Sequence, residues 1–269
     1  MSTTSYRAAL IQMRVTGGDV EGNLSRAESG IEAAFEGGAR LAVLPEALDI
    51  GWTYPACREL AETVPGGGAS NRLCAAAARH GLFVCAGLTE REGDRVYNAA
   101  ILIDPAGRIL LKHRKINELS IAHAFYDLGD RLNVVDTELG RLGVMICADA
   151  FAEGQVLSRS LGCMGAEVIL SPAAWAVLAD HDPMREPYGG LWREHYIPTA
   201  RAFGTWIIGV SHVGPITAGP WAGRKCIGCS LAIDPAGREV LQGPYGETAE
   251  AILWVDITLG ERRRRARDL

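Results

Sequence analysis

The chain has 269 residues, of which 48% are apolar and 22% charged, enough to bury a substantial core without disulfide or metal crosslinks. A formal net charge of −5 argues against broad binding to nucleic acid or anionic lipid. No apolar stretch reaches the roughly 18 residues of a membrane span, and residues 1–6 lack the charged and apolar regions of a secretory signal. Seven cysteines, an odd number, fit reduced thiols. We therefore expect a cytoplasmic protein that acts on neither nucleic acid nor membrane.

Short apolar, β-branched runs alternate with longer amphipathic stretches, which is typical of a layered α/β fold. Most of the runs are apolar on both faces, as expected for strands covered on each side. The predicted strands are 6–15, 40–44, 82–89, 97–104, 109–113, 142–147, 167–171, 206–212, 229–234 and 251–257. The predicted helices are 23–36, 70–80, 151–165 and 190–203, with Asn23 and Ser70 as expected N-caps.

No linker, charge block or low-complexity segment divides the sequence, so we expect one domain over residues 1–269. Its core spans about 6–257, and a basic tail follows at 261–269. The hexapeptide Ile-Asp-Pro-Ala-Gly-Arg occurs twice, at 103–108 and 233–238, each time between two apolar runs. Asp-Pro-Ala-Gly suits a hairpin turn. The repeat indicates either chance convergence on a good turn or two similar halves that pack as pseudo-symmetric sheets.

Three segments place a reactive side chain just past the end of an apolar run, where α/β folds present their sites. These side chains are Glu46, Lys115 and Cys147. Taken singly, they fit a solvated loop carboxylate, a surface charge and an inert buried thiol. Taken together, they supply the base, the oxyanion partner and the nucleophile that amide hydrolysis through a covalent acyl enzyme requires.

These segments resemble the nitrilase superfamily of carbon–nitrogen hydrolases. The likeness is carried, in the family's order, by LPEA around Glu46, HRKIN around Lys115 and GVMICADAF around Cys147, and it continues in SPAAW and GCSLAIDPAGREVL. The resemblance implies a four-layer αββα sandwich of two pseudo-symmetric mixed sheets. It also implies that Glu46 acts as general base, Lys115 as electrostatic stabiliser, Cys147 as nucleophile and the backbone N–H of Ala148 as an oxyanion donor, without metal or organic cofactor.

Two departures from the family's pattern affect the predicted site. Family members commonly carry a second glutamate between the lysine and the cysteine, but the expected position falls at Ala122 and His123. Glu118 is the nearest candidate for that supporting role and His123 the second, while a plain loop carboxylate is the alternative for Glu118. The nucleophile is followed by Ala-Asp, whereas nitrile-cleaving members usually have Trp-Glu there. This difference favours an amide or carbamoyl substrate.

The segment after the 167–171 strand lies where the family places its substrate-facing residues. Ala173, Ala174 and Trp175 are therefore candidate substrate-binding residues, with a purely structural role in the core as the alternative for Trp175. The stretch 181–192 looks like a lengthened loop near the pocket mouth, and such loops often determine specificity.

The sequence thus predicts a hydrolase that cleaves a small linear amide or N-carbamoyl compound through a Cys147 thioester. A nitrile-hydrolysing enzyme and a catalytically silent binding or assembly protein remain the alternatives. The Cys-x-x-Cys spacing of Cys226 and Cys229 has no second pair or nearby His, so we expect no metal site. The family's habit predicts a homodimer or a larger homo-oligomer.

Overall fold

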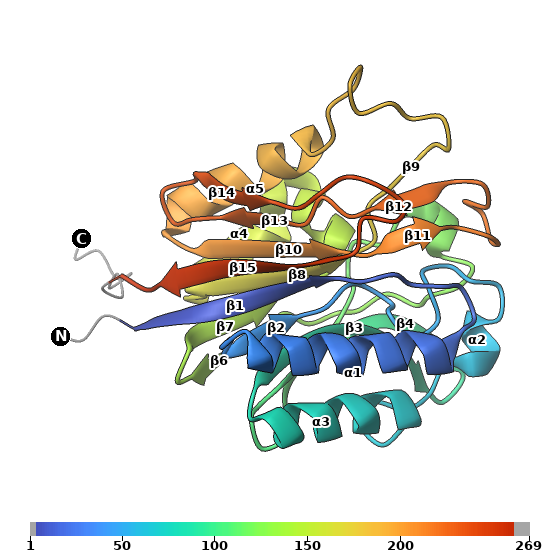
Figure 1. Cartoon of the computed structure of the whole chain (residues 1–269), viewed down its shortest axis with the longest axis horizontal. Coiled ribbons are helices and arrows are strands. Elements are labelled where there is room, and N and C mark those ends of the chain that lie inside the picture. The colour runs from blue at the N-terminus through green and yellow to red at the C-terminus, as the bar shows by residue number, and fades with distance from the viewer. Residues whose placement is uncertain (1–3, 261–269) are drawn as a thin grey trace.

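The structure, a computed structural model, describes residues 4–260, so the predicted basic tail at 261–269 lies outside the described residues. Two six-stranded sheets dominate it (Figure 1). The first sheet has the order β15-β1-β2-β3-β4-β5 and the second β14-β13-β10-β8-β7-β6. The strands of the first are β1 (Ser5–Gln12), β2 (Leu41–Val43), β3 (Phe83–Glu92), β4 (Arg95–Ile103), β5 (Ile109–Arg114) and β15 (Ala251–Thr258). Those of the second are β6 (Val134–Thr137), β7 (Gly140–Val144), β8 (Val168–Ala173), β10 (Trp206–Ser211), β13 (Leu231–Ile233) and β14 (Glu239–Gln242).

The two sheets repeat the same pairing pattern. In the first, the parallel strands β1, β2 and β3 are flanked by antiparallel β15 on one side and by the antiparallel pair β4 and β5 on the other. In the second, the parallel strands β7, β8 and β10 are flanked by antiparallel β6 and by the antiparallel pair β13 and β14. The predicted pseudo-symmetric pair of mixed sheets is confirmed.

The repeated hexapeptide forms the same hairpin turn in both halves. Oδ1 of Asp104 accepts the backbone N–H groups of Ala106 and Arg108 at 3.0 and 2.8 Å, and Oδ1 of Asp234 accepts those of Ala236 and Arg238 at 2.9 Å each. Gly107 and Gly237 adopt φ values of 78° and 72°. Glycine adopts such positive values readily because it has no Cβ, whereas other residues disfavour them. The repeat therefore reflects equivalent β4–β5 and β13–β14 hairpins.

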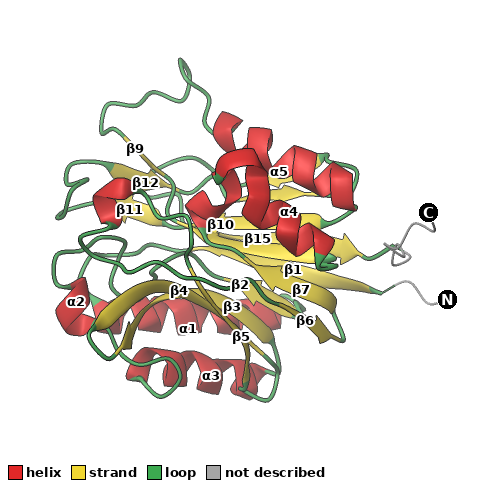
Figure 2. Ribbon diagram, turned by 180° about the vertical axis from the view of Figure 1, so that it is seen from behind, coloured by secondary structure: helices red, strands yellow, loops and turns green. Residues whose placement is uncertain are grey.

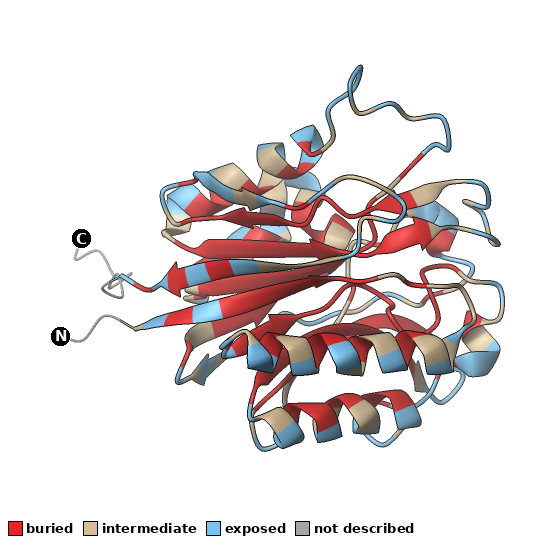
Figure 3. Cartoon of the chain, viewed as in Figure 1, coloured by how far each residue is buried: buried red, intermediate tan, exposed pale blue. Residues whose placement is uncertain are grey.

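Helices cover the outer face of each sheet (Figures 1 and 2). Helices α1 (Val20–Glu36) and α3 (Gly68–His80) pack on the first sheet, and α4 (Val156–Cys163) and α5 (Gly190–Phe203) pack on the second. Between the sheets, buried apolar side chains from both meet in one cluster that includes Leu10, Leu102, Val144 and Ile208. The inner strands are consequently buried on both faces, as Figure 3 shows along β10, whereas the edge strands β6, β14 and β15 are partly exposed. This arrangement explains the apolar composition of the inner strands and confirms the αββα sandwich.

Several local expectations were wrong. Helix α1 begins before Asn23, and Asp19 is its N-cap, accepting the N–H of Gly22 at 3.1 Å. Asn23 is instead buried, and its side chain binds the backbone of Thr16 and Asp49. Helix α3 has Gly67 rather than Ser70 at its N-cap.

The stretch 151–165 is not one helix, because Gly154 and Gln155 adopt positive φ values of 63° and 57°. Two 3₁₀ turns precede α4 instead, one of five residues at Cys147–Phe151 and one of three residues at Glu153–Gln155. The sequence also did not predict the short elements α2 (Cys57–Leu60), the 3₁₀ turn Ser120–Ala122, β6, and the small sheet of β9 (Ala176–Val177), β11 (Val213–Pro215) and β12 (Lys225–Ile227). Within residues 4–260, no helix is both long and apolar enough to cross a bilayer.

Candidate active site

Three loops that follow strands bring the predicted reactive side chains to one cavity. Glu46 lies three residues beyond the end of β2, Lys115 directly follows β5, and Cys147 lies three residues beyond the end of β7. The backbone N–H of Glu46 donates to the carbonyl of Ala173 at the end of β8, which ties the two sheets together here. Glu46, Lys115, Cys147 and Ala148 all line a cavity of about 230 Å³.

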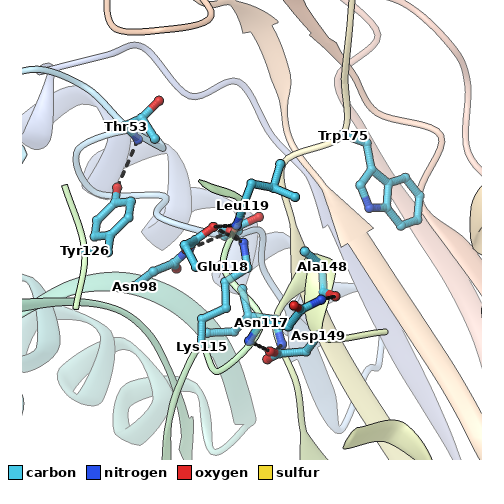
Figure 4. A network of polar contacts seen from close by, with 12 residues as sticks. Thr53, Asn98, Lys115, Asn117, Glu118, Leu119, Tyr126, Ala148, Asp149 and Trp175 are labelled. Carbon is cyan, nitrogen blue, oxygen red and sulfur yellow. Dashed lines mark hydrogen bonds and ion pairs between the residues drawn. The ribbon is translucent and has the colours of Figure 1, made fainter. Parts of the chain in front are cut away.

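Lys115 lies between two buried carboxylates. Its Nζ is 2.8 Å from Oε1 of Glu46 and 2.9 Å from Oε1 of Glu118, and each of the three side chains is at most 2% exposed. Asn98 of β4 links the same carboxylates, because its Nδ2 donates to Glu46 at 2.7 Å and to Glu118 at 3.0 Å. Figure 4 shows Lys115, Asn98 and Glu118 converging on one point. One ammonium group thus holds two carboxylates together in the interior.

Glu118, and not His123, makes the contact with Lys115. The imidazole of His123 is exposed, and its Nε2 lies 3.2 Å from the backbone carbonyl oxygen of Glu118. Ala122 is fully buried in an apolar cluster. A carboxylate three residues after Lys115 therefore reaches its ammonium, at an earlier position in the chain than the resemblance implied.

The surroundings of this group shift its acid–base equilibria. Burial raises the pKa of Glu46, and the negative charge of Glu118 raises it further, against the opposing effects of Lys115 and Asn98. Burial by itself lowers the pKa of Lys115, but the charges of Glu46 and Glu118 outweigh it and raise that pKa well above its usual value. Lys115 accordingly stays protonated, and Glu46 is a stronger base than an exposed carboxylate.

Cys147 opens the 3₁₀ turn after β7 in an uncommon backbone conformation. Its φ is 45°, and for a residue other than glycine such a conformation costs on the order of 1–3 kcal/mol. The side chain is half-buried. Burial raises the pKa of its thiol well above the usual value, and Glu46 adds to the rise, while Lys115 and a hydrogen bond from the Ala174 N–H oppose it. The resting group is a protonated thiol beside a buried carboxylate.

Asp149 organises the loops around Cys147, a role that the sequence analysis did not identify. Its carboxylate is fully buried and accepts hydrogen bonds from the backbone N–H groups of Ile116 (3.0 Å), Asn117 (2.8 Å) and Ile146 (2.9 Å) and from Nε2 of His113 (2.7 Å). Burial alone would raise the pKa of Asp149, but His113 and these N–H groups lower it below its ordinary value. The signal was present in the sequence, since Asp149 and His113 lie in two of the quoted motifs.

Asn117 adds a second link between the same loops. Its Nδ2 donates to the carbonyl oxygen of Ala148 at 2.6 Å (Figure 4), and Ala148 directly follows Cys147 in the chain. Asp149 and Asn117 together connect the segment that carries Lys115 to the turn that carries Cys147.

Aromatic side chains form most of the remaining wall of the cavity. They come from distant parts of the chain, and they are Trp52, Phe151, Trp175, Tyr188, Trp192 and Trp221. Trp175 both lines the cavity and packs in the core, because it is 1% exposed and stacks on Trp192 with ring centroids 4.5 Å apart. Ala174 also lines the cavity, whereas Ala173 contributes its backbone carbonyl to Glu46 instead. No spacing rule could have found Trp52 or Trp221, since neither belongs to a quoted motif.

The lengthened loop predicted at 181–192 contributes to the cavity at its end. Tyr188 lines the wall, and its hydroxyl accepts the indole N–H of Trp192 at 3.0 Å. The loop is fixed by His181, whose Nδ1 lies 2.7 Å from the hydroxyl of Tyr245. Met184 at the loop's tip is 89% exposed. Only the part of the loop next to α5 therefore faces the cavity.

Comparison with known proteins identifies the family of the chain. A family model described as carbon-nitrogen hydrolase matches residues 7–267. A nitrilase from Pyrococcus abyssi is 30% identical over 267 residues, covering 98% of this chain and 94% of its own. A chloroplastic omega-amidase from Arabidopsis thaliana is 28% identical, covering 97% of this chain and 70% of its own.

The fold has a close counterpart among solved structures. An amidase from Nesterenkonia sp. superposes with a TM-score of 0.78 at 23% identity, covering 94% of this chain and 90% of its own. At that identity the likeness establishes the fold, while the family match establishes the class of chemistry. The chain therefore belongs to the carbon–nitrogen hydrolases of the nitrilase superfamily and is a hydrolase that acts on C–N bonds.

Proposed function

We propose that the protein hydrolyses a small amide or N-carbamoyl compound through a thioester on Cys147. The observation that carries the proposal is the contact of Nζ of Lys115 with Oε1 of Glu46 at 2.8 Å, in the same cavity that Cys147 lines. Base, cation and nucleophile thus share one buried site. The names of the relatives, a nitrilase and an omega-amidase, are compatible with this class of substrate.

In the acylation step, Glu46 accepts the thiol proton of Cys147 as the sulfur forms a bond to the carbonyl carbon. The carbonyl oxygen becomes an oxyanion, which Lys115 and the backbone N–H of Ala148 stabilise. One such donor is typically worth about 3 kcal/mol of the barrier. The oxyanion then re-forms the carbonyl, the C–N bond breaks, and Glu46 gives its proton to the departing nitrogen. The products of this step are ammonia or an amine and a thioester.

In the deacylation step, Glu46 removes a proton from water, and the resulting hydroxide attacks the thioester carbonyl. The C–S bond breaks, the carboxylic acid leaves, and the proton held by Glu46 returns to the sulfur. The raised pKa values of Glu46 and Cys147 support this proton exchange, because a protonated thiol needs a base and a carboxylate with a raised pKa is a better one. Glu118 would keep Lys115 in place throughout.

A partition experiment tests the thioester. Wild-type protein is given a primary amide and the methyl ester of the same acid, each with hydroxylamine, and the acid, the hydroxamate and the released ammonia are measured. A shared thioester predicts the same ratio of hydroxamate to acid from both compounds. A ratio that depends on the leaving group, or no ammonia from any short amide or N-carbamoyl compound, would contradict the proposal.

Nitrile hydrolysis is the second candidate, and the identity to a protein named nitrilase favours it. The matched comparison is a nitrile and the amide of the same acid, with ammonia release as the readout. The catalytically silent role was motivated by the missing second glutamate and by the Ala-Asp that follows Cys147. The contact of Glu118 with Lys115 at 2.9 Å removes the first of these motives.

Two further expectations stay predictions. They are a cytoplasmic location and a homodimer or larger homo-oligomer. Light scattering at micromolar concentration should give at least twice the mass of the chain, and a monomer mass would contradict the second expectation.

A further inference from the structure

The wall of the cavity differs sharply in character from its reactive end. Beyond Glu46, Lys115 and Cys147, the described residues that line it carry no charged side chain. Two aromatic groups form the wall. Trp52 and Trp221 meet edge to face with ring centroids 4.8 Å apart, and Trp175, Trp192, Tyr188 and Phe151 form a continuous set of ring contacts. The wall is therefore suited to an apolar group.

The charge at the reactive end opposes an anionic ligand. Lys115 is the only cation among the described residues that line the cavity, and its ammonium is already within 2.9 Å of both Glu46 and Glu118. Two carboxylates around one ammonium leave a formal charge of −1 at this end. A carboxylate on a bound ligand would lose its hydration and would meet no free cation there.

One more cation lies nearby, but outside the wall. The guanidinium carbon of Arg224 is 4.3 Å from the centre of the Trp221 ring, stacked on that ring. Arg224 is half-buried and does not line the cavity. Arg224 lies beside Trp221 outside the cavity. Its substitution therefore tests whether a cation near the cavity binds the carboxylate of a ligand.

We propose that the substrate carries an uncharged apolar group, aromatic or branched aliphatic, on the scissile carbonyl, and that amides bearing a second carboxylate are poor substrates. The excluded class comprises ω-amides of dicarboxylic acids and N-carbamoyl amino acids. The inference rests on the proposed function for its chemistry, but it concerns the group that fills the aromatic wall. An apolar group there displaces water from aromatic surface, whereas a carboxylate meets no cation on the described wall.

The sharpest test is a pair of amides of nearly equal shape. 5-Methylhexanamide and glutaramate differ by an isopropyl group in place of a carboxylate, and 3-phenylpropanamide and acetamide extend the series. We expect kcat/KM for 5-methylhexanamide to exceed that for glutaramate by about 100-fold or more, since desolvation of an unpaired charge is unfavourable. Equal or faster hydrolysis of glutaramate would overturn the inference while leaving the thioester chemistry intact.

Single substitutions test which residues determine the preference for an apolar group. Trp221→Leu should lower the ratio of kcat/KM for 3-phenylpropanamide over acetamide by about 10-fold, the scale of losing part of an apolar pocket. The matched control is Trp254→Leu, at an exposed tryptophan on β15 outside the cavity, which should leave the ratio unchanged. Arg224→Met should not alter the preference against glutaramate. A stronger preference against glutaramate in that variant would show that Arg224 pairs with the ligand's carboxylate in the wild-type protein, and would contradict the inference.

A binding measurement separates this inference from the hydrolytic proposal. Four tryptophans line the cavity, so their fluorescence reports occupancy without turnover. Titration of the Cys147→Ala variant should show tighter binding of 3-phenylpropanamide than of glutaramate. If no amide were hydrolysed but this order of binding held, the proposed function alone would fail. Tighter binding of glutaramate would contradict the inference whatever the enzyme's activity.

Discussion

Nε2 of His113 lies 2.7 Å from Oδ2 of Asp149, and the two side chains are 1% and 0% exposed. His113 belongs to β5, two residues before Lys115, and Asp149 is two residues after Cys147. This buried contact therefore joins the strand end that presents the cation to the turn that presents the thiol. The lowered pKa of Asp149 keeps its carboxylate ionised and able to accept all of its hydrogen bonds.

The Asp149→Asn variant should lose both stability and activity. An amide keeps one acceptor oxygen but turns an NH₂ group toward donors, so at least one buried N–H is left unpaired. We expect the free energy of unfolding to fall by about 2–3 kcal/mol and kcat to fall more than KM rises, because the turn that carries Cys147 shifts. Urea unfolding and steady-state kinetics measure these quantities. A variant with normal kcat would show that Asp149 serves stability alone.

A double-mutant cycle with His113→Gln provides the control for that variant. If the His113 contact carries part of the effect, the two substitutions together should cost less than the sum of the single costs. Additive costs would show that the backbone N–H groups of Ile116, Asn117 and Ile146, and not His113, account for the role of Asp149.

The Glu118→Gln variant tests the second carboxylate. Glu118 raises the pKa of Glu46, so its neutralisation should lower that pKa and move the acid limb of the kcat/KM profile to lower pH. Loss of one charged contact to Lys115 should also reduce kcat by about 10- to 100-fold. His123→Gln is the matched control and should leave the profile unchanged, since His123 is exposed. An unmoved acid limb in Glu118→Gln would remove Glu118 from the site.

Asp49 predicts a specific dependence of stability on pH. Burial raises the pKa of its carboxyl group to about 6, although Thr89 and Ile50 donate hydrogen bonds to it. The folded protein thus binds the Asp49 proton more tightly than the unfolded chain, whose aspartates titrate near pH about 3.9. This contribution is complete below about pH 4 and is lost as the pH rises through about 6, a change of about 3 kcal/mol.

The Asp49→Asn variant removes this titration. Urea unfolding from pH 4 to pH 8 should show the free energy difference between wild type and variant changing between pH 4 and pH 6 and staying constant above that range. A difference that is constant across the whole range would mean that Asp49 has the same pKa in the folded and unfolded states.

The parts of the fold that were predictable are those in which local chemistry agrees with tertiary structure. Strands buried on both faces are mostly apolar, so their positions could be predicted closely. The repeated Asp-Pro-Ala-Gly-Arg turn correctly indicated two equivalent halves. The errors arose where contacts with residues outside the element determine its boundaries. Asn23 has a good capping side chain, but it is drawn into bonds with Thr16 and Asp49, and Asp19 caps the helix instead.

The candidate site was predictable to the same extent. Glu46, Lys115 and Cys147 each follow an apolar strand, and this position made them recognisable as candidates in the sequence. Trp52, Phe151, Trp192 and Trp221 reach the cavity from separate loops and helices, so their common position depends on the packing of both sheets. Asp149 and His113 lie in motifs that the sequence shows, but the bonds of Asp149 to residues 32 to 36 positions earlier depend on the same packing of both sheets.

Ammonia release by the Cys147→Ala variant tests the central claim most directly. The assay compares this variant with wild type and with Cys163→Ala, which removes an exposed thiol outside the cavity, on the best amide of the series. The account predicts that Cys147→Ala loses activity by about 10⁴-fold or more, as expected when a covalent nucleophile is removed, while Cys163→Ala matches wild type. A Cys147→Ala variant that released ammonia within a few-fold of the wild-type rate would contradict the account.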